Sequence, residues 1–340
     1  MTIHSTILAA ENTIETGNPI LNIAIFVIFI VATMTIVVRA TRQTSQKGSD
    51  FYTGGASFSG WQNGLAIAGD YLSAAAFLGV TGAIALYGYD GFLYSVGFLI
   101  ALLVALVLVA EPLRNTGKFT MADVLSFRLK QRPVRTAAAM STLMISLFYL
   151  IAQMAGAGGL VALLLGISGK AAQAGVVAIV GVLMIIYVLV GGMKGTTYVQ
   201  MIKAVLLVGG SIIIALLTFW FIKGGFNAVL ETAIANHPKG EAIVNPGLKY
   251  GKNELTKLDF ISLGAALVFG TAGLPHVLMR FYTVPTAREA RRSVTWTIGI
   301  VALFFLLTVV MGYGAAALVG PEQIQAAPGG VNSAVLLLSS

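Results

Sequence analysis

The sequence predicts an all-α membrane protein whose chain crosses the bilayer eight times. Of its 340 residues, 57% are hydrophobic and only 10% are charged, whereas soluble domains carry about 25% charged residues. The few charges lie between long uncharged runs, each of which reaches the roughly 18–20 residues that a helical crossing needs. These runs cover residues 16–38, 71–89, 91–110, 136–169, 171–193, 204–222, 260–279 and 293–321.

The same composition excludes several other classes of protein. There is no cysteine, so disulfide scaffolds, thiolate zinc sites and cysteine nucleophiles are absent, and the three histidines are too scattered for a metal cluster. The net charge of +8 does not indicate a nucleic-acid partner, because the basic residues lie in short loops between apolar runs. We expect no cleaved signal peptide, since residues 1–18 are acidic and Ile7–Ala10 is too short an apolar run. We also expect no enzyme, because His, Asp and Glu residues do not cluster near a predicted membrane surface.

The loops predict the orientation of the chain in a cell membrane. Four loops on one side hold 15 of the 21 Lys and Arg residues, and they are 39–60, 111–135, 194–203 and 280–292. Short basic loops remain cytoplasmic, which places the N-terminus outside. The 34-residue run 136–169 is too short for two crossings and a turn, so it predicts one tilted span. Residues 191–200 predict a short cytoplasmic turn.

The second crossing, Trp61–Gly88, contains an ionisable residue and several glycines. Asp70 lies about 13 Å along the helix from Trp61, near the middle of the bilayer, where a charge costs at least ~2.5–3.5 kcal/mol. Glycines flank it and weaken the helix, so we expect unwinding near Gly69–Ser73 that leaves carbonyls free. Free carbonyls cannot face lipid, and they must line a cavity or hold an ion. The alternative is that Asp70 forms a structural pair or lies near the membrane surface.

The seventh crossing, Phe260–Phe281, is predicted to break between Gly270 and Pro275. Two glycines, Thr271 and a proline lie within six residues, and proline removes one helical hydrogen bond. His276 follows and is expected either to contact substrate or to bind to neighbouring helices. Arg280 is expected to extend to the cytoplasmic surface or to anchor the basic segment that follows.

The positions of these two spans predict a secondary transporter. If the first crossing is peripheral, the broken spans are the first and sixth of the remainder, and a five-crossing repeat has an inverted second copy. Paired discontinuous helices of this kind indicate a binding site at the membrane midplane. Helix N-termini attract anions, while helix C-termini and free carbonyls suit a small cation. A carboxylate with a coupled Na⁺ therefore fits better than a sugar or a lipid.

Three blocks of the sequence resemble the sodium:solute symporter family, and most closely its cation/acetate (monocarboxylate) permease branch. They are DFYTGGASFSGWQNGLAIAGDYLSAAAFLGVTG at 50–82, NTGKFTMADVLSFRLKQRPVR at 115–135 and GTAGLPHVLMRFYTVPTAREARRS at 270–293. The resemblance implies a LeuT-type inverted-repeat bundle with an extra N-terminal helix at 19–39, a first repeat at 61–223 and an incomplete second repeat at 260–340. It also implies uptake of acetate or similar anions from outside, coupled to Na⁺ or H⁺, with no other cofactor.

The family's sites carry over onto matching positions of this chain. Main-chain carbonyls of Gly69 and Leu72 would hold Na⁺, in a register that becomes Ala68 and Tyr71 if shifted by one residue. Side chains of Asp70 and Ser73 would lie near the cation. Substrate contacts would come from Tyr71, Ala76, Gly270, Thr271 and His276, with Gln153 as a further residue that could face the substrate path.

The resemblance departs from the family pattern in the second repeat. Only two of its five spans precede Ser340, and the core helix that supplies cation-coordinating hydroxyls is missing. We therefore expect the chain to be a fragment of a longer transporter. The alternatives are a transporter-like sensor domain, which a signalling module after residue 340 would favour, and a channel, which would not need two broken helices.

Overall fold

The computed structural model describes residues 19–42, 48–117, 119–164, 170–327 and 329–339, and this part of the chain contains helices and no strands. The N-terminal segment, for which the sequence predicts no signal peptide, lies outside the described residues. The long helices are α1 Pro19–Arg42, α3 Gly60–Tyr71, α5 Tyr89–Val104, α8 Gln131–Leu164, α9 Lys170–Phe221, α10 Gly225–Asn236, α11 Glu254–Ala265 and α13 Ala287–Leu318. Shorter helices are α2 Gly48–Thr53, α4 Val80–Tyr87, α6 Ala110–Thr116, α7 Met121–Leu125, α12 Pro275–Leu278, α14 Pro321–Ala326 and α15 Ala334–Ser339.

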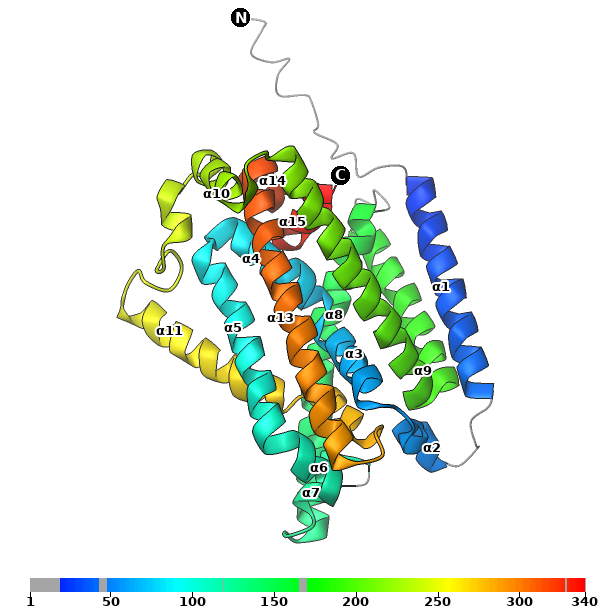
Figure 1. Cartoon of the computed structure of the whole chain (residues 1–340). Helices are drawn as coiled ribbons and strands as arrows, with labels where there is room; N and C mark the ends of the chain where they lie inside the picture. Colours follow the sequence, from blue (N-terminus) through cyan, green and yellow to red (C-terminus); the bar gives the residue numbers. More distant parts are fainter. Residues whose placement is uncertain (1–18, 43–47, 118, 165–169, 328, 340) are drawn as a thin grey trace, which may run out of the picture.

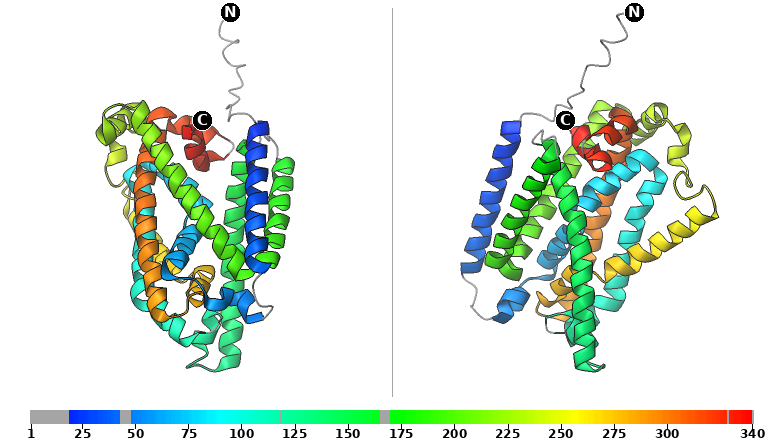
Figure 2. Two further views of the ribbon diagram at one scale, coloured as in Figure 1. Left: turned by 45° about the vertical axis from the view of Figure 1, so that its right-hand side comes forward. Right: turned by 180° about the vertical axis from the view of Figure 1, so that it is seen from behind.

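The 52-residue helix α9 is two crossings joined by a turn at one glycine. Gly192 has φ 51° and ψ −157°, a conformation that favours glycine, and the chain reverses there into two arms, 170–191 and 193–221 (Figure 2). Met193–Lys203 is therefore already helical. The predicted loop 194–203 and the predicted turn 191–200 are wrong in this respect, because the backbone leaves the helical conformation only at Gly192.

The crossings agree with the eight that the sequence predicts. Six helices of the described chain are long and apolar enough to span a bilayer, and the bent pair Gly60–Tyr71 and Ala75–Tyr87 makes a seventh. The second arm of α9 supplies the eighth. The run 136–169 is a single helix as far as Leu164, as predicted.

The helices differ strongly in how much protein surrounds them. Helix α1 lies at the edge of the molecule against α9 (Figure 1), and only 11% of its apolar 18-residue stretch is buried. Helix α13 runs through the middle of the bundle beside α3, and 39% of its apolar 18-residue stretch is buried. The exposed apolar side chains of the outer helices form the surface that lipid would cover.

The segments that the sequence places on one side of the membrane lie at one end of the molecule. Helices α2, α6, α7 and the beginning of α13 lie at the lower end in Figure 1, and α10 and α14 lie at the upper end. At the upper end, the buried carboxylate of Asp90 accepts hydrogen bonds from the backbone N–H groups of Gly247, Lys249 and Tyr250 at 2.9, 2.6 and 3.0 Å. These bonds hold the segment before α11 against the start of α5.

Candidate functional site

The first broken span unwinds where the sequence predicts. Helix α3 ends at Tyr71, Leu72 has φ −74° and ψ 62°, and the two halves of the span are bent by 62°. The second half begins with a π-helical turn, Ala75–Gly79. Backbone donors in this segment use the carbonyls of Ala68, Tyr71 and Ser73. No described backbone N–H donates to the carbonyls of Gly69, Asp70 or Leu72, so the break leaves polar main chain free.

The second broken span has a related irregularity. A π-helical turn, Ala266–Gly270, precedes an extended residue, Leu274, with ψ 119°, and Pro275 then begins helix α12. Proline suits this first helical position because its missing N–H would be unpaired there in any case. The Tyr71 hydroxyl donates a hydrogen bond to the carbonyl of Thr271 at 3.3 Å, which joins the two breaks.

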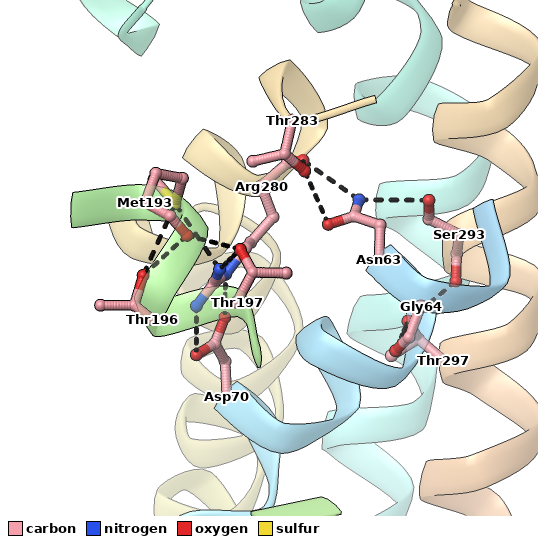
Figure 3. Close-up of polar contacts among 10 residues, drawn as sticks. All are labelled: Asn63, Gly64, Asp70, Met193, Thr196, Thr197, Arg280, Thr283, Ser293 and Thr297. Carbon is pink, nitrogen blue, oxygen red and sulfur yellow. Dashed lines mark hydrogen bonds and ion pairs between the residues drawn. The ribbon is translucent and has the colours of Figure 1, made fainter. Parts of the chain in front are cut away.

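Asp70 forms a buried ion pair with Arg280, as Figure 3 shows. The guanidinium donates to the two carboxylate oxygens at 2.8 and 3.3 Å, and both side chains are 5% exposed. Arg280 also donates to the Thr197 hydroxyl at 2.5 Å and to the Met193 sulfur at 3.5 Å. The prediction that Arg280 reaches the cytoplasmic surface is wrong. Asp70 is not a lone charge, and the alternative expectation for it, a structural pair, is the one that the structure shows.

The backbone of Arg280 is fixed by a second polar network. Asn63 on α3 donates from Nδ2 to the carbonyl of Arg280 and to the Ser293 hydroxyl, each at 3.1 Å (Figure 3). The Thr283 hydroxyl donates to Oδ1 of Asn63 at 2.9 Å. The two breaks and α13 are therefore connected by hydrogen bonds, and the ion pair has a defined geometry.

Two neighbouring cavities lie beside the breaks. The larger has a volume of about 550 Å³ and the smaller about 80 Å³. Both are lined by a common set of residues, which are Asp70, Ser73, Tyr149, Gln153 and His276. The Tyr149 and His276 rings lie 4.7 Å apart between centroids. The predicted Gln153 therefore does border the cavities.

Most of the predicted site residues meet at these cavities. Leu72 lines the larger one, while Tyr71, Ala76 and Thr271 line the smaller one. Gly69 and Gly270 are not among the lining residues. Gly69 instead lies against α9, where an added Cβ would come within 2.2 Å of the Gln200 carbonyl oxygen.

Sequence reasoning missed the three polar residues Tyr149, Gln200 and Lys203, which line the larger cavity. Gln200 and Lys203 were placed in a cytoplasmic loop, because a charged residue ends any uncharged run. Gln200, Lys203 and Leu207 follow one another at intervals of three and four residues, which is the spacing of one helix face. This spacing could have identified Gln200 and Lys203 as residues of a helix.

Comparisons with known proteins agree with this architecture. A Na⁺-coupled sialic acid symporter, solved in a substrate-bound outward-open state, is similar in structure with a TM-score of 0.72, over 95% of this chain and 70% of that one, at 17% sequence identity. At that identity the likeness shows the fold, which is LeuT-type.

Two curated relatives are similar in sequence. A monocarboxylic acid transporter of Corynebacterium glutamicum is 63% identical over 99% of this chain, and an uncharacterized symporter of Bacillus subtilis, YwcA, is 49% identical over 94%. The chain spans 63% and 61% of the length of these relatives. The sodium:solute symporter family model matches residues 51–339. The chain is therefore a multi-pass membrane protein that belongs to the sodium:solute symporter family, a family of transporters and not of enzymes.

Proposed function

We propose that the full-length protein imports short monocarboxylates together with Na⁺ by alternating access. The observation that carries the proposal is the pair of cavities between two broken spans, because free carbonyls and helix ends beside a cavity are the means by which such transporters hold an anion and a cation. The names of the relatives support the two ligands: one transports monocarboxylic acids and another is Na⁺-coupled.

The smaller cavity supports a short acid such as acetate, propionate or pyruvate. A cavity of about 80 Å³ has room for about five waters, at roughly 15 Å³ each. Tyr71, Ala76 and Thr271 contribute to its wall, and Thr271 is the only one of them with an aliphatic hydroxyl. We propose that the carbon chain of the substrate binds here.

For the coupling ion, we propose the free carbonyls of Gly69 and Leu72 with the half-buried Ser73 hydroxyl nearby. Asp70 and Arg280 would hold the end of α3 and so fix these carbonyls. The protein would lie in the cell membrane with its N-terminus outside, because the basic loops gather at one end. The two repeats would be 61–223 and a second one that begins at 260, with 19–39 as an additional helix.

Uptake by proteoliposomes tests the proposal. The full-length protein is reconstituted, and radiolabelled acetate, propionate and pyruvate are offered with an inward Na⁺ gradient, a K⁺ gradient or a pH gradient. We expect accumulation that depends on Na⁺. Accumulation driven only by the pH gradient would replace Na⁺ by H⁺, and no uptake of any short acid would overturn the proposal.

A pair of matched variants links uptake to the smaller cavity. Thr271→Val exchanges a buried cavity hydroxyl for a methyl group, and Thr295→Val makes the same exchange on the exposed face of α13. We expect Thr271→Val to raise KM for pyruvate, whose keto oxygen can accept from the Thr271 hydroxyl, about five- to tenfold, which corresponds to about 1–1.4 kcal/mol. Thr295→Val should leave KM unchanged.

A further inference from the structure

Lys203 lies inside the membrane-spanning part of the molecule. It is ten residues from Met193, where the second arm of α9 begins, so it lies about 15 Å along the helix, near half the thickness of the bilayer core. Together with Gln200 and Leu207 it forms one face of α9, and all three residues line the larger cavity. Across that cavity lie the first break, with Ser73, and His276 of the second broken span.

No acidic residue of the described chain forms an ion pair with Lys203. The five ion pairs there join Arg135 to Asp123, Lys257 to Glu254, Arg280 to Asp70, Arg291 to Glu111 and Arg292 to Glu289. The one acid that lines the same cavity, Asp70, already accepts from Arg280 with both oxygens. Asp70 and Arg280 cancel, so Lys203 leaves the cavity with a net charge of +1.

A second unsatisfied group lies one turn away on the same face. Oε1 of Gln200 is buried and has no hydrogen-bond partner in the described chain. Buried polar groups in folded proteins are almost always paired, so an unpaired amide oxygen beside an unpaired ammonium indicates a missing polar ligand. Oε1 only accepts, so an anion bound at Lys203 would be met by the Nε2–H donors of Gln200, and the lack of a partner at Oε1 leaves the amide free to turn them toward it. An excess positive charge at membrane depth is costly unless an anion neutralises it.

We propose that Lys203 binds the carboxylate of the transported anion. The inference rests on the proposed function and adds the residue that recognises the charged group of the substrate. With the carboxylate at Lys203 in the larger cavity, the carbon chain would extend past Ser73 and His276, which line both cavities, into the smaller one. Binding of the anion neutralises the charge of Lys203, and this explains why an anion and not a neutral solute is selected.

The test compares three variants of the full-length protein. Lys203→Met removes the charge at similar length, and Lys203→Arg keeps it. As a control, Lys223→Met removes an exposed lysine two residues after the end of the same helical arm. We expect Lys203→Met to raise the Kd and KM for acetate at least tenfold while the half-saturating Na⁺ concentration stays within twofold. Lys203→Arg should recover part of the affinity, and Lys223→Met should behave as wild type.

A thermal readout separates this role from a purely structural one. The substrate-free Lys203→Met protein should unfold at the same temperature as wild type or higher, because an uncompensated charge has been removed. The stabilisation that acetate gives to the wild type should disappear in it. An unchanged acetate Kd in Lys203→Met, or a change confined to the Na⁺ dependence, would overturn the assignment of Lys203. Failure of the wild type to bind any short acid would instead overturn the proposed function itself.

Discussion

Removal of one partner of the Asp70–Arg280 pair is expected to destabilise the protein more than removal of both. Each side chain is 5% exposed, so neither charge can be screened by water. Asp70→Asn leaves the guanidinium without its anion, and Arg280→Gln leaves the carboxylate without its cation. The double variant leaves two neutral amides that can hydrogen-bond to each other.

The size of the effect follows from the burial and the geometry. Loss of one partner of a buried pair costs about 3–5 kcal/mol, whereas replacement of both is often close to neutral. Arg280 also donates to the hydroxyl of Thr197 at 2.5 Å, so Arg280→Gln should cost about 1 kcal/mol more than Asp70→Asn. The double variant should therefore be more stable than either single variant.

Thermal unfolding of the full-length protein in detergent measures these differences. At about 2 °C per kcal/mol for a chain of this size, each single variant should unfold about 6–10 °C below wild type. The exposed pair Arg135–Asp123, at 3.0 Å, provides the control, and Arg135→Gln should lower the midpoint by no more than about 2 °C. If the losses of the two single variants simply add in the double variant, the reasoning is refuted.

Three further perturbations probe other parts of the structure. Gly69→Ala should abolish folding or transport, because its Cβ would lie 2.2 Å from the Gln200 carbonyl oxygen. Gly79→Ala is the control and should be tolerated, because the nearest atom to its Cβ would be 3.7 Å away. Expression level and uptake measure both effects. Asp90→Asn should weaken three hydrogen bonds to the segment before α11, costing about 1–3 kcal/mol, and limited proteolysis should then cleave that segment faster. Burial lowers the pKa of His237, which follows α10, so stability should be full above the ordinary value near 6.5 and should fall as pH falls below it. A pH series of unfolding midpoints should show this dependence reduced in His237→Asn.

The broken spans could be predicted from sequence because local chemistry determines them. Glycines around Asp70, and the Gly270–Pro275 segment, weaken helical hydrogen bonding wherever the chain places them. The boundary at Gly192 could not be located as well, because the uncharged run ends at Lys194 while the chain reverses at Gly192 itself. Charge marks the end of a span only when the charged side chain lies at the surface.

That condition explains why part of the site was missed. Lys203 and Arg280 were assigned to cytoplasmic loops by the same rule, although both lie inside the protein. Arg280 is separated from Asp70 by 210 residues, so no local pattern connects them, and only the folded bundle brings the charges together. A mid-span acid predicts that some cation lies nearby, and the arginine after the second break was the available candidate.

Sodium dependence tests which groups of the first break would hold the coupling ion. Since Arg280 donates to both oxygens of Asp70, the pair contributes no net charge. The carbonyl oxygens of Gly69, Asp70 and Leu72 accept no described backbone hydrogen bond, and those of Gly69 and Leu72 are the ion ligands that we propose. The unfolding midpoint of the Asp70→Asn/Arg280→Gln double variant is first compared with that of the wild type, to establish that the variant is folded. We then expect its half-saturating Na⁺ concentration to stay within about twofold of the wild-type value. Ser73→Ala should raise that concentration about fivefold, equivalent to about 1 kcal/mol. Loss of Na⁺ coupling in the folded double variant would instead assign the ion to the carboxylate of Asp70, and Arg280 would then be the group that the ion displaces.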